Sequence, residues 1–314
     1  MPLAVVAVGG NALIRDSSLQ SVADQYTASV EMMRHITTMI QEGWDVVVTH
    51  GNGPQVGFNL RRSELANKHD GLHSVPLDSC VADTQGSIGY MFQQVLKNEF
   101  VLRGMDKESV TLVTRVLVDR NDPAFESPTK PIGSFMTEEE ALKKQKEEGW
   151  TVIEDAGRGW RRVVASPVPE GVLEENAIKT LASQGFVVVA AGGGGIPVYR
   201  RKDGIVAGIE AVIDKDYVSA LLASRLEADL LVISTGVEKV ALNFGKPNET
   251  KLDRMTVEEA ERYLKEGHFA AGSMGPKIEA ILHYLQNGGK RALITSPEKL
   301  TDSVSGSGGT EVVA

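Results

Sequence analysis

Short apolar runs that end in glycine-rich turns, each followed by a helical pattern, recur along this chain of 314 residues. Residues 3–8 read LAVVAV before Gly9 and Gly10, and residues 45–49 read DVVVT before the turn HGNG at 50–53. These runs are continuous rather than alternating, which is typical of strands buried on both faces of a mostly parallel sheet. The pattern therefore predicts an α/β fold in which helices cover the sheet.

The same rhythm predicts further helices and strands. Residues Val22–Gln41 form a helical pattern that Gly43 ends, in the position favoured at a helix C-terminus. After an expected helix at Asp78–Phe100 and an expected strand at Ser109–Val118, the rhythm stops until Leu173. The resumed pattern comprises a helix ending near Gly185, strands at Phe186–Ala191, Asp229–Ser234 and Arg291–Thr295, and a turn at Gly192–Gly195.

The segment Asp119–Pro169, called the insertion below, is rich in proline, glycine and charged residues. It holds one expected helix, with Thr137 as its cap and Glu140 three residues later. We interpret it as an insertion that folds over the sheet as a lid.

Since domains average about 150 residues, the length of the whole chain suits two lobes that share one sheet. We expect an N-terminal lobe from residues 1–118 and 170–190, and a C-terminal lobe from residues 191–314.

Composition excludes several classes of protein. Hydrophobic residues make up 42% of the chain and charged residues 24%, which is ordinary for a globular protein. No apolar run approaches the roughly 20 residues of a membrane helix. The formal net charge of −9 has the wrong sign for a dedicated nucleic-acid binder. The single cysteine, Cys80, and the lack of a signal peptide favour the cytoplasm.

Glycine follows three of the apolar strands at points where a ligand could bind. The turns lie at residues 9–12, 51–55 and 192–195. In open parallel sheets, ligands bind beyond the carboxyl ends of the strands, and glycine lets backbone N–H groups approach a phosphate closely. A tight turn alone would explain any single one of them, and none matches the P-loop or dinucleotide-binding pattern. Three such turns together favour a phosphate-binding crevice.

Three lysines stand in sequences that suit phosphoryl transfer. Lys130 lies between two prolines in PTKP, Lys215 lies between Asp214 and Asp216 where a helix begins, and Lys277 follows Gly275-Pro276. Each could be an ordinary surface lysine, and the two aspartates could be ordinary helix caps. Alternatively, Asp216 would aim Lys215 or hold a magnesium-bound water. Convergence of the lysines on one γ-phosphate would supply the charge neutralisation that phosphoryl transfer requires.

Other chemistries find little support. No pair of histidines has the spacing of a zinc protease, no G-x-S-x-G elbow is present, and Cys80 within its helix is interpreted as packing. The basic and aromatic residues of the insertion favour a salt-bridged lid over a nucleic-acid contact. They are Arg158, Trp160, Arg161 and Arg162.

Motifs spread over nearly the whole chain resemble those of carbamate kinase. They are GGNAL at 9–13, HGNGPQVG at 50–57, NDPAF at 121–125, PTKP at 128–131, GRGWR at 157–161, GGGIP at 193–197, AVIDKD at 211–216, GHFAAGSMGPK at 267–277 and GTEV at 309–312. The resemblance implies the amino-acid-kinase fold, an α/β/α sandwich with the phosphoryl acceptor in the N-terminal lobe and the nucleotide in the C-terminal lobe. It also implies a homodimer.

The activity implied by the resemblance is reversible phosphoryl transfer with Mg²⁺, in which ATP and carbamate give ADP and carbamoyl phosphate. This reaction commonly runs toward ATP at the end of arginine catabolism. Because carbamate is already anionic at its attacking oxygen, no general base is needed, which agrees with a sequence that offers lysines and glycines. No nucleic-acid or membrane partner is expected.

Residue roles follow by matching motif. Lys130 would reach carbamate, Lys215 and Lys277 would stabilise the transferring phosphoryl group, and Asp216 would orient them. The expected acceptor and phosphate-binding residues are Gly9, Gly10, Asn11, Gly51, Asn52, Gly53, Gly193 and Gly194. The expected nucleotide-binding residues are Asp214, Ser234, Val237, Ala271, Gly272, Ser273 and Met274, and no protein metal ligand is expected.

Two positions depart from the family's usual pattern. Residues 233–237 read ISTGV where many members carry LTDV, which affects base or ribose contacts. Arg115 follows Thr114 where glutamine is common, and it adds a positive charge that either alters acceptor preference or is neutralised by a neighbouring carboxylate. The alternatives are a related kinase for glutamate or acetylglutamate, which should lack PTKP, and a catalytically silent ligand-binding homologue.

Overall fold

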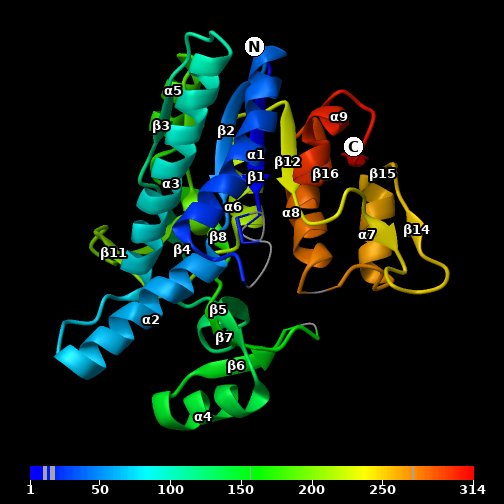
Figure 1. Cartoon of the computed structure of the whole chain (residues 1–314). Helices are drawn as coiled ribbons and strands as arrows, with labels where there is room; N and C mark the ends of the chain where they lie inside the picture. Colours follow the sequence, from blue (N-terminus) through cyan, green and yellow to red (C-terminus); the bar gives the residue numbers. More distant parts are fainter. Residues whose placement is uncertain (10–12, 15–17, 156, 271) are drawn as a thin grey trace.

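The structure is a computed structural model of the whole chain, and it describes residues 1–9, 13–14, 18–155, 157–270 and 272–314. An eight-stranded sheet forms its centre (Figure 1). Every neighbouring pair in this sheet is parallel except β16 with β17. The strands, in spatial order, are β15 (Arg254–Thr256), β17 (Thr310–Val313), β16 (Arg291–Thr295), β12 (Leu230–Ser234), β1 (Leu3–Val8), β2 (Asp45–His50), β9 (Val187–Val189) and β3 (Ser109–Thr111).

Helices cover both faces of this sheet and make three layers. In β1, Ala4, Val6 and Val8 pack toward one face, while Val5 and Ala7 pack toward the other, because successive side chains of a strand point to opposite sides. The first face carries α1 (Val22–Gln41), α3 (Leu77–Leu102) and α9 (Leu300–Val304). The second carries α5 (Glu175–Ser183), α6 (Lys215–Arg225), α7 (Val257–Lys265) and α8 (Met274–Gln286). The predicted α/β fold with a mostly parallel sheet is confirmed.

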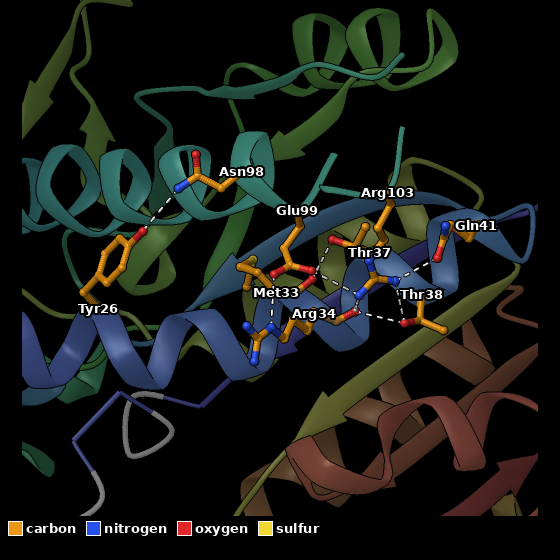
Figure 2. Close-up of polar contacts among 9 residues, drawn as sticks. All are labelled: Tyr26, Met33, Arg34, Thr37, Thr38, Gln41, Asn98, Glu99 and Arg103. Carbon is orange, nitrogen blue, oxygen red and sulfur yellow. Dashed lines mark hydrogen bonds and ion pairs between the residues drawn. The ribbon is translucent and has the colours of Figure 1, made fainter. Parts of the chain in front are cut away.

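The predicted helix at Val22–Gln41 is confirmed with the same bounds as α1. Ser21 caps it, and Gly43 follows it with a positive φ of 95°. Figure 2 shows how α1 is tied to α3: the buried carboxylate of Glu99 in α3 accepts a hydrogen bond from Arg34 of α1 (3.1 Å), and Arg103 at the end of α3 donates to Gln41 of α1 (2.8 Å). This pairing holds two long helices in fixed register over the sheet.

The expected strand Ser109–Val118 is wrong as one element. It splits into β3, at the edge of the central sheet, and β4 (Arg115–Val118), in a second sheet with β8 (Pro169–Val172), β10 (Ile196–Arg200) and β11 (Val206–Gly208). The break is stabilised at Thr114, whose backbone N–H (2.9 Å) and carbonyl (3.1 Å) both bond the side-chain amide of Gln85. Because a side chain satisfies these groups, the chain can leave the sheet at a buried position.

The insertion forms its own small unit, which projects from the sandwich beside α2 (Gly53–Asp70) in Figure 1. Its antiparallel strands are β5 (Lys130–Met136), β7 (Trp160–Val164) and β6 (Thr151–Glu154), and its helix is α4 (Glu138–Glu148). The predicted cap is confirmed, since Thr137 and Glu140 form a capping box. The remaining short elements are the 3-10 turns η2 (Pro123–Phe125), η3 (Gly192–Gly194) and η4 (Pro297–Lys299), and the hairpin of β13 (Ala241–Leu242) and β14 (Thr250–Lys251). None of the described helices combines the length and apolar character needed to cross a membrane.

Candidate active site

A cavity of about 510 Å³ opens where the parallel strands end. Gly9 follows β1, Gly51 follows β2, and Ser234 ends β12, so the lining comes from the carboxyl ends of neighbouring strands. The other lining residues come from the start of α2, the insertion, η3, the start of α6 and the residues before it, the loop after β12, the start of α8 and the residues before it, and η4. They are Asn52, Gly53, Pro54, Lys130, Arg158, Arg161, Gly193, Ile213, Asp214, Lys215, Asp216, Thr235, Gly236, Gly272, Ser273, Pro276, Lys277, Pro297 and Glu298.

The four glycines of 192–195 are required by close packing. A Cβ on Gly193 would lie 2.2 Å from the side-chain amide of Asn52, and a Cβ on Gly194 would lie 2.2 Å from the carbonyl oxygen of Ile213. Both glycines also have positive φ, which strains other residues. The turn can therefore sit directly on the loop after β2 only because it lacks side chains.

Two lysines share one buried carboxylate in the wall of the cavity. Lys215, the first residue of α6, donates a hydrogen bond to Oδ1 of Asp216. Lys277, in the first turn of α8, donates to Oδ2 of the same residue at 2.9 Å. The Asp216 side chain is only 4% exposed. This arrangement fixes two ammonium groups on neighbouring helices without using a flexible surface pair.

Burial alone would raise the pKa of Asp216, but the ammonium groups of Lys215 and Lys277 outweigh it and hold that pKa well below its usual range. Burial lowers the pKa of Lys215, with Asp216 opposing the shift. For Lys277, burial is outweighed by Asp216, and the pKa is raised. Asp216 therefore stays ionised and holds the ammonium groups of Lys215 and Lys277 at the cavity wall.

Lys130 reaches the same cavity from the insertion. It is the first residue of β5, and its Nζ lies 2.5 Å from Oδ2 of Asp214. Asp214 is also the N-cap of α6, because its Oδ1 accepts the backbone N–H of Asp216 at 2.8 Å. Burial tends to raise the pKa of Asp214, but Lys130 outweighs it and lowers the value. One carboxylate thus links the insertion to the N-terminus of a sandwich helix.

His50 lies behind the glycine-rich turns that border the cavity. Its ring is fully buried against Phe92, at 5.6 Å between ring centroids, and its Nδ1 lies 3.1 Å from the carbonyl oxygen of Gly51. Burial lowers the pKa of His50 to about 4. Within the described part of the chain its Nε2 has no hydrogen-bond partner. The imidazole is therefore neutral near pH 7 and acts as packing under the loop.

Residues 2–296 match the sequence model of the amino acid kinase family. The chain belongs to the amino acid kinase family. Among its relatives, the carbamate kinase of Thermococcus kodakarensis is 46% identical over 314 residues, covering 100% of this chain and 99% of the relative. A carbamate kinase-like protein of Escherichia coli is 51% identical over 312 residues, covering 99% and 98%.

Solved structures of the same family share the fold. The structure of carbamate kinase from Giardia lamblia bound to AMP-PNP has a TM-score of 0.89 and 40% identity, covering 99% of this chain and 98% of that one. The structure of the Giardia enzyme bound to citric acid has a TM-score of 0.94 and 39% identity, with the same coverage. The three-layer sandwich described above is therefore the amino-acid-kinase fold.

In this family member, most residues predicted as site residues from sequence line the cavity. Val237, Gly194 and Met274 do not. Gly194 packs on the backbone of Ile213 beneath the cavity wall, and Met274 packs on the hydrophobic core. Gly10, Asn11 and Ala271 lie outside the described residues. The structure therefore brings together all three lysines, both aspartates and the predicted glycines after β2.

Sequence reasoning missed several lining residues. Arg158 and Arg161 were expected only to form local salt bridges, and both do pair with Asp155, at 2.8 Å and 3.3 Å. They also line the cavity. Their position in the GRGWR motif, on the same insertion as Lys130, was the available signal. Pro297 and Glu298 were missed because nothing marks the turn after Thr295 except its place behind a buried strand.

The departure at Arg115 proves to be neutral for the cavity. Its guanidinium lies 2.6 Å from the carboxylate of Glu174, and it is not a lining residue. The alternative in which a neighbouring carboxylate neutralises it is the one the structure contains. At the other departure, Ser234, Thr235 and Gly236 line the cavity, and a Cβ on Gly236 would meet no atom within 4 Å.

The carboxylates that line the cavity bear on how a divalent cation could be held. Within the described residues no group of three or more His, Cys, Asp or Glu side chains is arranged to hold a metal ion. Asp214 and Asp216 are both bonded to lysines. Because lysines engage both of these carboxylates, the two aspartates fit Mg²⁺ only through the substrate phosphates that usually hold this ion.

Proposed function

We propose that this protein is a carbamate kinase, which transfers a phosphoryl group reversibly between ATP and carbamate. One observation carries the proposal: Lys130, Lys215 and Lys277, from three distant segments, line a single cavity and are each paired with an aspartate in its wall. Carbamate oxygen would bond to the γ-phosphorus of ATP while the bond to the β-phosphate oxygen breaks. Lys215 and Lys277 would neutralise the charge on the transferring PO₃ group, and Lys130 would hold the carbamate.

No proton needs to be removed from the attacking oxygen, because carbamate is already an anion. This suits a cavity whose two aspartates are engaged by lysines and whose nearby histidine is buried and neutral. Mg²⁺ held by the nucleotide phosphates would add further charge neutralisation. The protein's own contribution is to position the two substrates and to stabilise the negative charge of the transferring phosphoryl group.

The test is a coupled assay of ATP formed from purified protein, ADP and carbamoyl phosphate. We expect turnover with carbamoyl phosphate, and none above background when acetylglutamyl phosphate or glutamyl phosphate replaces it. Preference for either of the latter would support the related-kinase alternative. Binding of nucleotide without turnover of any acyl phosphate would support the silent homologue. Lys130, on the insertion, lines the cavity, and this favours a carbamate kinase over both the related kinase and the silent homologue.

We also propose that the reaction runs mainly toward ATP, at the end of arginine catabolism, and that the protein is a cytoplasmic homodimer. These assignments rest on the motif resemblance and on the single, buried cysteine Cys80. Initial rates in both directions at cellular substrate concentrations test the first. Light scattering on the purified protein tests the dimer, and cell fractionation tests the location.

We propose that the insertion acts as a lid, because carbamate decomposes in water and Lys130 reaches the cavity from this small unit. Limited proteolysis within residues 119–169 should fall when an ATP analogue and carbamoyl phosphate are added together. Unchanged cleavage under saturating ligands would exclude the lid.

A further inference from the structure

The first strand of the insertion crosses helix α2 at very short range. A Cβ placed on Gly57 would lie 2.2 Å from both the Cα and the N of Gly133, in β5. One turn earlier, a Cβ on Gly53 would lie 3.5 Å from the carbonyl oxygen of Pro131. Gly53 and Gly57 are four residues apart, so they lie on one face of α2. That face is where β5 lies against the helix backbone.

The same contact continues into a buried apolar cluster. Ile132, between Pro131 and Gly133, is 1% exposed and packs in one cluster with Val56 and Leu60 of α2. Gly133 has a φ of +72°, a conformation that glycine adopts without strain. The strand is therefore fixed on α2 both by a side chain in the core and by direct backbone contact.

Two cavity cations depend on this contact. Lys130 is three residues before Gly133 in β5, and its Nζ pairs with Asp214. Arg161 donates from Nη2 to the carbonyl oxygen of Gly133 at 2.9 Å, and its side chain is 11% exposed. The backbone that touches Gly57 thus leads directly to Lys130 and accepts a hydrogen bond from Arg161.

We propose that Gly57 is a positioning residue for the acceptor end of the site: its missing side chain lets β5 lie close enough to α2 to place Lys130 and Arg161 over the cavity. Gly57 itself does not line that cavity. Glycine is disfavoured inside a helix, so its presence in α2 agrees with a requirement for close packing. The inference deepens the proposed function and rests on it for its kinetic test.

The size of the effect follows from the geometry. Ordinary van der Waals contact begins at 3.4 Å, so relieving a contact of 2.2 Å in Gly57→Ala moves β5 and α2 apart by about 1.2 Å (3.4 minus 2.2). A misplacement of about 1 Å can lower enzymatic rates by about 100-fold. Because Lys130 and Arg161 both belong to the insertion, the loss should fall on the acceptor and not on the nucleotide.

The experiment compares Gly57→Ala with Gly86→Ala. Gly86 also lies inside a helix, α3, but an added Cβ there meets no atom within 4 Å, so it controls for helix propensity. For Gly57→Ala we expect kcat/KM for carbamoyl phosphate to fall about 100-fold, with the KM for ADP within about twofold of wild type. Equal rises in both KM values, or kinetics like those of Gly86→Ala, would overturn the proposal.

A second readout does not depend on turnover. Trp150 of the insertion and Gly57 line the same cavity of about 160 Å³ between β5 and α2, and the Arg162 guanidinium lies 4.6 Å from the Trp150 ring centroid. The fluorescence of Trp150 is identified as the part of the tryptophan emission that disappears in Trp150→Phe. Its quenching by acrylamide should increase in Gly57→Ala and not in Gly86→Ala. If wild type lacks carbamoyl phosphate turnover but quenching changes as expected, the proposed function fails while the contact survives. Unchanged quenching in folded Gly57→Ala overturns the positioning role.

Discussion

The two aspartates of the cavity hold their lysines in different environments. Asp216 belongs to the sandwich, is 4% exposed and binds Lys215 and Lys277, which are 10% and 17% exposed. Asp214 is 19% exposed and binds Lys130, which is 25% exposed and comes from the insertion. The first group is fixed by burial within one folded core. The second is positioned by the contact between a separate small unit and that core.

This difference has an energetic side. Removing one member of a buried ion pair leaves an uncompensated charge and typically costs about 3–5 kcal/mol, whereas more exposed pairs contribute about 1 kcal/mol or less. The sandwich lysines should therefore be coupled to both stability and chemistry. Lys130 should be coupled mainly to substrate binding.

The largest expected effect is that of Lys277→Ala. Loss of one preorganised charge-stabilising group lowers kcat by about 100-fold or more, so we expect that loss in the coupled assay. Lys290→Ala, a lysine 67% exposed and paired with Asp229, is the control and should keep wild-type kcat. Near-normal turnover of folded Lys277→Ala would contradict the role assigned to the sandwich pair.

Burial within the sandwich should also appear as acid sensitivity. The pKa of His50 is about 4 in the folded protein against an ordinary value of 6.5. Between these pH values the unfolded chain binds a proton that the folded protein does not, so the free energy of unfolding falls as pH drops from 6.5 to 4. The full shift corresponds to about 3 kcal/mol.

Urea unfolding of His50→Gln and wild type at pH 7, 5.5 and 4.5 measures this term. The variant removes the titrating ring, so its stability should decline less steeply over that range. His69→Gln, at an exposed position in α2, should follow the wild-type slope. Parallel slopes for wild type and His50→Gln would show that the buried imidazole does not govern acid stability.

Lys130→Ala should give a smaller and different change. We expect the KM for carbamoyl phosphate to rise about 10-fold, as when one charged contact of about 1.4 kcal/mol is lost, with the KM for ADP almost unchanged. Steady-state kinetics with each substrate varied in turn separates the two. Lys143→Ala, exposed on α4 of the same insertion, is the matched control. A fall in kcat equal to that of Lys277→Ala would show that Lys130, bound to Asp214, has the same role as the lysines bound to Asp216.

The smallest effect should come from Arg115→Gln. Its guanidinium is paired with Glu174 and half-exposed, outside the cavity lining. Acceptor KM values should stay within about twofold of wild type, because an exposed pair contributes about 1 kcal/mol or less even to stability. A changed acceptor preference would show that the charge of Arg115 affects substrate binding even though Glu174 neutralises it.

Much of the fold was predictable because its signals are local. The helix Val22–Gln41 is marked by its apolar spacing and by a glycine that ends it, and β1 and β2 are marked by uninterrupted apolar runs. The split between β3 and β4 was not predictable. It depends on Gln85, about thirty residues earlier in the chain, whose side chain satisfies the backbone of Thr114.

The candidate site divides in the same way. The residue types and turns that suit phosphoryl transfer, including Lys130, Lys215, Lys277 and the three glycine turns, can be read from the sequence, because short-range backbone geometry and charge determine them. Which aspartate binds which lysine, the entry of Arg161 into the cavity wall, and the contact of Gly57 with Gly133 were decided only by tertiary structure. These contacts join segments far apart in the chain, and their distances depend on how whole helices and sheets pack.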